Sequence, residues 1–383
     1  MLGDAETRAV RRRIDPNRIK PCITTATRSG ESDTLYYVVN FADSAGFALV
    51  AADSTSPAPL LAVTEQGNYT PGEVTNTGFD DYISLLADNT GGGNILLPDT
   101  LILERDTTSL IIVDTLVVDT YSDWEIYGPY INVKWGQGQS ITFNSTFPYN
   151  QFCYNKNNEL CYAGCYPVAV AQLMTYHRFP PSYILSFASN AVRYVNWSLM
   201  NSYTGGTYFP WNQTAIDNVS FLIREIGERA HINYTTQGSG VDAEFFASTL
   251  GTFGYTSDVL QNYSYYGVIQ NLKEERPVLM SGVNSMNKGH VWIADGYKSR
   301  NLKHQEILVY SDQRQEIMSE TTYYYRYLHM NWGYNGNNNG YFADGVYNLN
   351  AEYQYDGANT PFDNIQYDFQ YIVRYIGGIQ RNN

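Results

Sequence analysis

Cys165 is the residue in this sequence best placed to act as a nucleophile. It follows Gly164 and opens an apolar stretch, residues 166–172, that predicts the start of a helix. A thiol at a helix N-terminus lies close to unpaired backbone N–H groups and to the positive end of the helix dipole, and both favour the thiolate. Because the thiolate is the attacking form, this position suits covalent catalysis. A buried core cysteine is the alternative, and the local sequence does not decide between the two.

The base for such a thiol would be one of the five histidines in the sequence. His290 follows a glycine where the chain enters an apolar strand, so we expect it at the mouth of that strand, which suits a site on top of a sheet. His177 lies on the predicted helix of Cys165 but about 18 Å from the thiol, because a helix rises about 1.5 Å per residue. His329 lies within a predicted strand, where a structural role is more common. We therefore assign the role of base to His290.

Two further groups are needed, one that orients the base and one that stabilises the oxyanion. Asp295 is five residues after His290, and the period of two in a strand puts it on the opposite face, so we discount it. Asn331 and Trp332, on a neighbouring predicted strand, are better candidates. An amide carbonyl accepts an imidazole N–H and an indole shields the pair from water, although Trp332 could equally be an ordinary core residue. Gln137, between two glycines, could donate its amide to the oxyanion.

The order and spacing of these residues strengthen the assignment. Glutamine, cysteine, histidine and asparagine occur in the same order along papain-like proteases. His290 is 125 residues after Cys165, near the papain-type spacing of roughly 130–150 residues.

Composition bounds the class of protein. A chain of 383 residues is long enough for two domains, and 43% apolar with 16% charged residues indicates a globular protein. The net charge of −14 argues against a nucleic-acid binder. No stretch reaches the roughly 18–20 apolar residues that span a membrane. The first residues lack the apolar core of a signal peptide.

The four cysteines are too few for a disulfide scaffold. Besides Cys165 they are Cys22, Cys153 and Cys161. A bridge between Cys153 and Cys161 across a loop is an open alternative. A zinc site made of Cys153, Cys161, Cys165 and His177 is disfavoured, because it lacks the closely spaced ligand pairs of structural zinc sites.

The first 100 residues or so predict a small α+β unit. Residues 1–20 are rich in arginine and predict a flexible, solvated arm. β-branched and aromatic runs then predict strands, and a turn at 42–46 joins two of them. The predicted strands are 35–41, 47–52 and 60–63, and a short amphipathic helix is predicted over 79–88.

The rest of the chain predicts a larger unit with helices first and strands later. Helices that precede an antiparallel sheet indicate an α+β fold. Residues 94–120 are strand-like or linker, and we place the domain boundary after residue 115. The predicted helices are 167–177, 216–230 and 242–250, and the predicted strands are 277–282, 290–294, 306–310 and 327–332.

Several blocks spread over most of the chain resemble the streptopain family of cysteine proteases. Residues 164–180 carry Gly-Cys and then Ala-Gln-Leu-Met-Thr-Tyr-His, and residues 289–297 carry Gly-His followed by Asp-Gly. Residues 329–334 read His-Met-Asn-Trp-Gly-Tyr, and 135–138 with 148–150 match the region of the oxyanion glutamine. The N-terminal runs 36–41, 46–53 and 59–62 are similar to the pro-domain of that family.

The resemblance implies a papain-like catalytic domain, with helices packed on an antiparallel sheet, over residues 116–383. It implies that residues 1–115 form an inhibitory pro-domain, which displaces the catalytic histidine or blocks the cleft until the chain is cut between 100 and 125. The family is exported by bacteria, so we expect a secreted, cell-surface or periplasmic protein whose signal peptide has been removed. The expected partners are protein or peptide substrates and the chain's own pro-domain, with no nucleic acid.

Two features depart from the family pattern. Tyr166 and Pro167 follow the cysteine where the family has smaller residues. Proline is tolerated in the first turn of a helix, whereas Tyr166 could alter access to the thiol. Residues 301–326 are a long insertion between the histidine strand and the Asn-Trp strand. Both features bear on substrate preference more than on catalysis.

The sequence thus predicts a cysteine endopeptidase synthesised as an inactive zymogen. Cys165 attacks the scissile carbonyl, His290 acts as base and then as acid, and Gln137 holds the oxyanion with the Cys165 N–H. Asn331 and Trp332 support His290, and no metal or organic cofactor is required. Two alternatives stay open: a catalytically silent surface or binding protein on the same fold, and an acyl transferase that uses the same dyad and incorporates amines.

Overall fold

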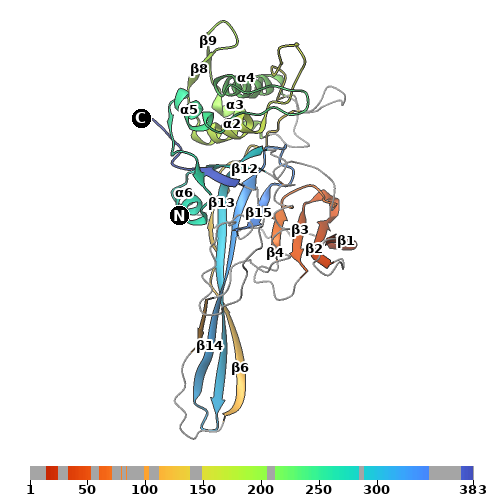
Figure 1. Ribbon diagram of the computed structural model, residues 1–383, viewed down its shortest axis with the longest axis vertical. Coiled ribbons are helices and arrows are strands. Elements are labelled where there is room, and N and C mark those ends of the chain that lie inside the picture. The colour runs from red at the N-terminus through yellow and green to blue at the C-terminus, as the bar shows by residue number, and fades with distance from the viewer. Residues whose placement is uncertain are drawn as a thin grey trace, which may run out of the picture.

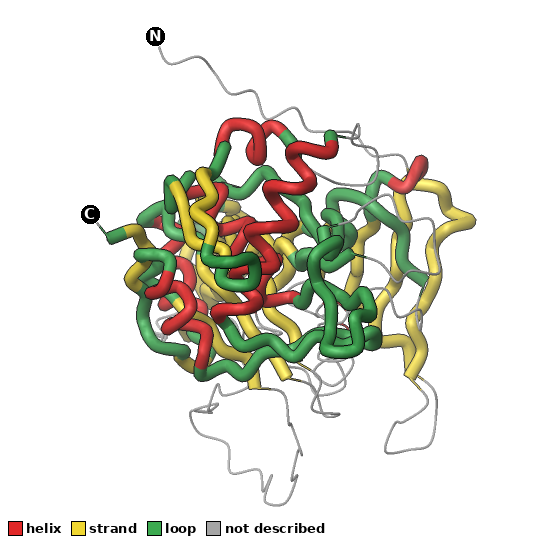
Figure 2. Tube along the Cα trace, turned by 90° about the horizontal axis from the view of Figure 1, so that it is seen from above, coloured by secondary structure: helices red, strands yellow, loops and turns green. Residues whose placement is uncertain are grey.

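The computed structural model describes residues 14–24, 33–52, 60–70, 79, 83, 99–102, 112–138, 149–204, 212–283, 289–344 and 372–382. Its centre is a 13-stranded sheet, with a lobe of helices at one end and an arm of strands at the other (Figure 1). Seen from above, the helices lie over the strands (Figure 2). The α+β class and the helices packed on an antiparallel sheet are as predicted.

The helices of the described residues include the one that carries the cysteine, α2, which begins at Cys165 itself. Predicted helices at 216–230 and 242–250 are α4 and α5. Two short helices, α3 and α6, were not predicted, and the predicted helix at 79–88 lies outside the described residues except for Phe79 and Ile83. The bounds are α2 Cys165–His177, α3 Trp197–Ser202, α4 Gln213–Arg229, α5 Phe245–Thr252 and α6 Tyr265–Lys273.

The large sheet runs through both halves of the sequence, in the order β1-β2-β3-β4-β15-β14-β13-β12-β16-β11. On this path the strands are β1 Ile14–Thr24, β2 Asp33–Phe41, β3 Phe47–Ala51, β4 Leu60–Thr64, β11 Gln261–Asn262, β12 Val278–Val283, β13 Gly289–Tyr310, β14 Gln315–Asn331, β15 Gly340–Ala343 and β16 Ile372–Ile376. Off it, β5 Asp99–Ile102 pairs with β14, and β6 Ile112–Tyr121 and β7 Glu125–Tyr127 pair with β13. Two small ribbons are β8 Ser182–Leu185 with β9 Ala191–Tyr194, and β10 Tyr255–Thr256 with β17 Gln380–Arg381.

The N-terminal strands join the rest of the sheet through one antiparallel pair, β4 with β15, in which Val63 lies opposite Tyr341. The predicted flexible arm is wrong from Ile14 onward, because β1 pairs with β2 as the edge strand of the sheet. Its two prolines make a strand difficult to predict from the sequence. An edge strand accepts proline because its outer side has no neighbouring strand that needs a backbone N–H donor. Residues 1–13 lie outside the described residues.

The sheet separates two apolar cores, and the alternation of β13 distributes its side chains between them. Val291 and Ile293 pack in the first core with α2 and α4. Trp292 and Ala294 pack in the second core with Trp332 and the side chains of β2 to β4. Helix α2 is enclosed on all sides, with every residue from Tyr166 to Thr175 buried.

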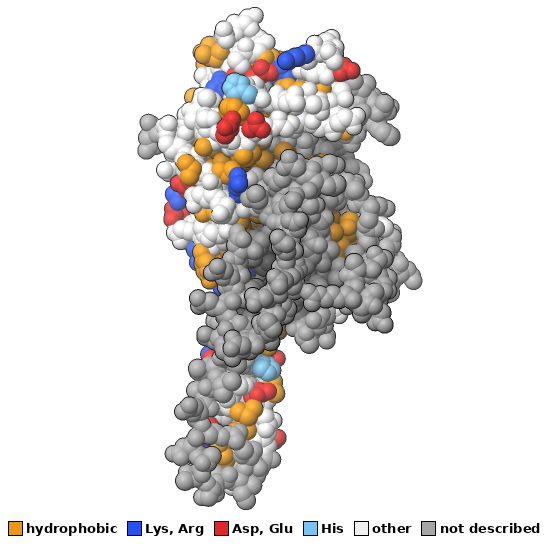
Figure 3. Space-filling view, viewed as in Figure 1, with side chains coloured by type: hydrophobic (Ala, Val, Ile, Leu, Met, Phe, Trp, Pro, Cys, Tyr) orange, Lys and Arg blue, Asp and Glu red, His pale blue; other side chains and the backbone are white. Residues whose placement is uncertain are grey.

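Residues 301–326, predicted as an insertion, continue β13 and β14 into a long hairpin. We call the arm the part of this hairpin that pairs with β6, together with β6 itself (Figure 1). Hydrophobic side chains lie on the surface of the arm (Figure 3), and Val117 is 59% exposed. The two strands predicted at 290–294 and 306–310 are therefore one strand of 22 residues.

Candidate active site

The chain turns into α2 at Gly164, which has φ of 89°. A larger residue would be strained at this φ, and its Cβ would lie 2.5 Å from the Ile232 side chain. The turn leaves Cys165 half-buried as the first residue of the helix. Its sulfur faces the backbone N–H groups of Val291, of Tyr166 and of Cys165 itself. The thiol therefore lies beside the residue that follows His290.

The thiol of Cys165 is not predisposed to ionise in this conformation. Burial raises its pKa, and the three backbone N–H groups that oppose this effect do not outweigh it. The helix N-terminus by itself favours the thiolate. Desolvation is the larger effect here, so the thiol form prevails at neutral pH.

His290 is the second residue of β13, lies opposite Gly282 of β12, and is 2% exposed. Its Nε2 is 3.0 Å from the backbone carbonyl of Trp332. Since a carbonyl only accepts, Nε2 carries the hydrogen and Nδ1 keeps its lone pair. Burial lowers the pKa of His290 to about 4, against a smaller opposing effect of the Trp332 carbonyl. The imidazole is therefore neutral, with a base nitrogen available.

The imidazole of His290 lies on the face of the sheet away from α2. Three aromatic rings surround it, with ring centroids 6.0 Å away at Trp292, 6.5 Å at Trp332 and 5.3 Å at Tyr334. All three belong to the second core or pack against it, whereas Cys165 packs against the first. Within the described part of the chain, no hydrogen bond joins the Cys165 sulfur to His290. The two residues are neighbours across the strand but are not engaged.

A backbone hydrogen bond holds Gln137 close to Cys165. Its carbonyl accepts a hydrogen bond of 2.9 Å from the N–H of Ala163, two residues before Cys165. Gly138 has φ of 83°, and Asn150 occupies the space where a Cβ would lie. Asn150 in turn donates 2.7 Å to the carbonyl of Cys161. Glycine is therefore required beside Gln137 so that the two loops can pack together.

Asn331 does not contact His290 in this structure. Its Nδ2 donates to the Val133 carbonyl at 3.0 Å and to Gln172 Oε1 at 3.3 Å. Its Oδ1 accepts from Gly333 N–H at 3.2 Å. The partner of the imidazole is instead the carbonyl of Trp332, whose side chain is fully buried. The structure thus places the predicted residues in one region, with Trp332 rather than Asn331 against the histidine.

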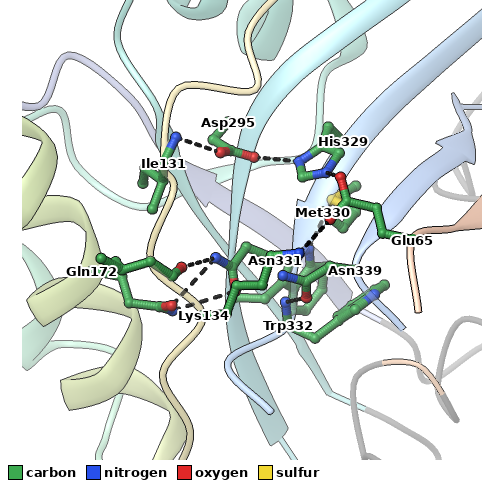
Figure 4. A network of polar contacts seen from close by, with 12 residues as sticks. Glu65, Ile131, Lys134, Gln172, Asp295, His329, Met330, Asn331, Trp332 and Asn339 are labelled. Atoms are coloured by element: carbon green, nitrogen blue, oxygen red, sulfur yellow. Dashed lines mark hydrogen bonds and ion pairs between the residues drawn. The ribbon is translucent and has the colours of Figure 1, made fainter. Parts of the chain in front are cut away.

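A second histidine centre lies nearby and was not predicted. His329 Nδ1 is 2.6 Å from Asp295, and its Nε2 is 3.3 Å from Glu65, which also binds Lys134 at 2.8 Å (Figure 4). Asp295 sits at a bulge in the pairing of β13 with β14, and its other oxygen accepts from Ile131 N–H at 2.8 Å. Asp295 therefore orients His329 and does not contact His290, in agreement with the strand period.

The two carboxylates outweigh burial at His329. Burial alone would lower its pKa, but the charges and hydrogen bonds of Asp295 and Glu65 raise it to about 9. The same contact is the main reason that the pKa of Glu65 is lowered to about 2. Both groups are charged at neutral pH, so this is an ion-paired cluster that joins the residue after β4 to β14.

Tyr166 does not obstruct the thiol, contrary to the concern raised by the sequence. Its ring is fully buried and stacks on Phe246 with centroids 4.5 Å apart. Its hydroxyl donates a hydrogen bond of 2.8 Å to the Phe246 carbonyl.

Of the other cysteines, Cys153 and Cys161 are free, buried thiols, so the bridge between them is not formed. Among the described residues no group of side chains could hold a metal ion, and no helix is long and apolar enough to cross a membrane.

Sequence reasoning also missed Gln172, Trp292 and Tyr334, which surround the predicted residues. Each lies inside one of the blocks 164–180, 289–297 and 329–334, so its position in the sequence is a signal. The sequence did not show that these three side chains contact the predicted site residues or the segments beside them. Gln172 reads as one more residue of an apolar helix, and the two aromatic residues read as core.

Comparisons with known proteins place this architecture among peptidases. Residues 143–342, more than half of the chain, match the model of the Peptidase C10 family. Streptopain from Streptococcus pyogenes is 21% identical over 348 residues, which cover 82% of this chain and 75% of streptopain. The structure of a fragment of Prevotella intermedia prointerpain A is similar in fold, with a TM-score of 0.56 and 18% identity, and it covers 95% of this chain and 100% of that fragment. This chain belongs to the Peptidase C10 family and is a cysteine-type peptidase.

Proposed function

We propose that the chain is a cysteine endopeptidase held as a zymogen, with Cys165 as nucleophile and His290 as general base. The observation that carries this proposal is the position of the Cys165 sulfur against the backbone N–H of Val291, the residue next to His290. The thiol and a neutral histidine with an unprotonated Nδ1 are therefore one residue apart along β13, and they meet when the imidazole turns to the other face of the sheet.

The chemistry follows from that pair. Once His290 has turned toward Cys165, its Nδ1 takes the thiol proton while the Asn331 side-chain carbonyl accepts its Nε2–H, and the thiolate attacks the scissile peptide carbonyl. The oxyanion is held by the Cys165 backbone N–H and the Gln137 amide, which we propose as its second donor. The imidazolium then protonates the leaving amine, and water hydrolyses the acyl-enzyme with His290 as base again. Asn331 and Trp332 support His290 from the neighbouring strand.

The N-terminal residues are proposed to inhibit the enzyme through the loop that holds Trp332. Glu65 N–H donates 2.8 Å to the Asn339 carbonyl, and Gln66 donates 3.0 Å to the Asn335 carbonyl. The same loop binds Trp332 through Asn339 Oδ1 at 3.0 Å and the Asn338 carbonyl at 3.1 Å. Because the Trp332 carbonyl holds His290, these contacts favour the face of the sheet on which the imidazole lies away from the thiol.

The division into an inhibitory unit, 1–115, and a catalytic unit, 116–383, is part of the proposal. The boundary falls inside β6, which pairs with β13. We propose that cleavage between residues 100 and 125 releases the N-terminal unit. The second core then loses the side chains of β2 to β4, and His290 becomes free to turn toward Cys165. Export from a bacterial cell, and protein or peptide substrates, complete the proposed function.

The test compares the full chain with its Cys165→Ala variant, incubated with casein under reducing conditions. The wild-type chain is expected to cut itself, to digest casein and to be labelled at Cys165 by a thiol-reactive epoxide. The variant is expected to do none of these. A variant that still processes itself would disprove the assigned nucleophile. A labelled wild type that transfers amines without hydrolysis would show acyl transfer, and an unlabelled, inert one a silent binding protein.

A further inference from the structure

We propose that Gln172 is a positioning residue that holds the three catalytic segments in register. This inference rests on the proposed function, because it concerns the geometry of Cys165, His290 and Gln137. Gln172 touches none of the reacting atoms. It acts through the backbone and side-chain groups that it binds.

Gln172 lies seven residues after Cys165 on α2, which is two turns along the same side of the helix. Its side chain is fully buried. Oε1 accepts from the backbone N–H of Trp135 at 3.0 Å and from Asn331 Nδ2 at 3.3 Å. Nε2 donates to Asn331 Oδ1 at 3.4 Å (Figure 4). One amide thus joins the nucleophile helix to two other segments.

Each partner of Gln172 is covalently close to a catalytic group. Trp135 is two residues before Gln137, the proposed oxyanion donor. Asn331 is one of the two residues proposed to support His290, and it precedes Trp332, whose carbonyl receives the Nε2–H of His290 in this conformation. Displacing either partner would therefore shift the oxyanion donor or the base relative to the thiol. A misplacement of about 1 Å in a catalytic group is enough to cost about 100-fold in rate.

The residue type is specified by this arrangement. Only a primary amide offers an acceptor to Trp135 and, at the same time, a donor and an acceptor to Asn331. Methionine has a similar length but would leave the Trp135 N–H and the Asn331 amide without these partners. Glutamate would keep the acceptor but not the donor. Thr175, one turn further on, is a similarly buried polar residue whose hydroxyl, among the described residues, binds the Gln172 backbone carbonyl of its own helix alone, at 2.6 Å.

The experiment measures kcat and KM on a peptide substrate, and the pH profile of Cys165 alkylation, for the full chain after activation. The variants are Gln172→Met, Gln172→Glu and, as the matched control, Thr175→Val, each with its melting temperature. Gln172→Met is expected to lower kcat about 10–100-fold with KM nearly unchanged and to shift the alkylation profile. Gln172→Glu should lie between Gln172→Met and the wild type. Thr175→Val should keep kcat within about threefold of the wild type.

Three results would overturn the inference. The first is a Gln172→Met enzyme with the kcat and alkylation profile of Thr175→Val. The second is a loss of activity in Gln172→Met that only follows the fraction of unfolded protein in the melting curve. The third is a wild-type chain that neither hydrolyses peptides nor takes up the label, which would overturn the proposed function and this role together. The first two leave the proposed function intact.

Discussion

His290 and His329 lie on neighbouring strands of the same sheet and are almost equally buried, at 2% and 3% exposure, yet they differ in charge. His290 is bound to one carbonyl among aromatic rings, and its pKa is lowered to about 4. His329 is bound by two carboxylates, and its pKa is raised to about 9. Burial is common to both, so the partners decide the charge.

The difference separates two roles within one sheet. A neutral imidazole with a free nitrogen is suited to take a proton, but a charged one held between carboxylates is suited to hold structure. The family block around Asn331 contains His329, and a search for a base near a carboxylate would have selected it. The absence of a carboxylate around His290, among the described residues, is what leaves its imidazole neutral.

Removing a carboxylate partner of His329 should have the largest effect on stability. Asp295→Ala leaves His329 without its closest partner and the Ile131 N–H without an acceptor. We expect a loss of about 3–5 kcal/mol in the free energy of unfolding, measured by urea denaturation. The control is Asp119→Ala, which removes the same type of partner, at 2.7 Å, from the partly exposed His304. It should cost less than about 1 kcal/mol, and equal losses in the two variants would contradict the comparison.

The Cys165 thiol should react as an isolated, desolvated cysteine in the full chain. With the Cys165 pKa raised and His290 neutral, the alkylation rate with iodoacetamide should rise only at alkaline pH, without a plateau below pH 7. After processing, an engaged thiolate–imidazolium pair should add such a plateau, with a gain of about 100-fold at pH 6.5. A plateau already present in the full chain would show that the pair is engaged before processing.

Glu65→Gln weakens the link between the N-terminal unit and His329. The pKa of Glu65 is below its usual 4.5, so its contribution to stability is present above that pH and is lost as the pH falls toward 2. The pKa of His329 is above its usual 6.5, so its contribution is complete below that pH and is lost as the pH rises through 9. The link should be strongest between about pH 4.5 and 6.5.

Hydrogen exchange of the β4 amides, measured in a Cys165→Ala background, tests this link. Glu65→Gln should lower their protection at pH 6 by about 1–2 kcal/mol, or roughly 5–30-fold. The difference in protection between the chain that keeps Glu65 and the Glu65→Gln variant should shrink at pH 9, where His329 loses its charge. Unchanged protection at pH 6 would mean that the cluster does not hold the N-terminal strands.

The smallest effect is expected at Asp344, a buried carboxyl bonded to the Tyr263 hydroxyl. Burial raises its pKa to about 7, and Tyr263 and Arg326 only partly oppose this. A raised carboxyl pKa means that stability falls as the pH rises from about 4 to 7. Asp344→Asn should raise the melting temperature by about 2–4 °C at pH 8 and leave it unchanged at pH 4. A gain of equal size at both pH values would point to packing instead of charge.

The residues of the candidate site carry local signals in the sequence, whereas their contacts do not. The local signals are the glycine before Cys165, the glycine before His290 and the Asn331-Trp332 pair. Each can be recognised from a few neighbouring residues. Which face of a strand His290 occupies, and that Asn331 binds Gln172, depend on packing between distant segments. The raised pKa of Cys165 also depends on this packing, because the assembled core desolvates the thiol.

The fold was predicted where elements are short and regular, and was wrong where they are long or atypical. β13 has 22 residues, well beyond the usual 3–10 of a strand, so the sequence pattern suggested two strands and an insertion. Helix α6 starts with tyrosines and was missed, although Ser264 caps it by accepting from Gly267 N–H at 3.2 Å. That serine is the kind of signal by which a helix start can be found.

The segment between the two proposed units pairs with both sides of the hairpin. β5 pairs with β14 on one edge and β6 pairs with β13 on the other, so the chain crosses from one edge to the other between Ile102 and Ile112. A cut between β5 and β6 would leave both of these strands held in the sheet by backbone hydrogen bonds. Hydrolysis and release would thus be separate events, and a nicked but still assembled species should persist until both the β4–β15 and the β5–β14 pairs open.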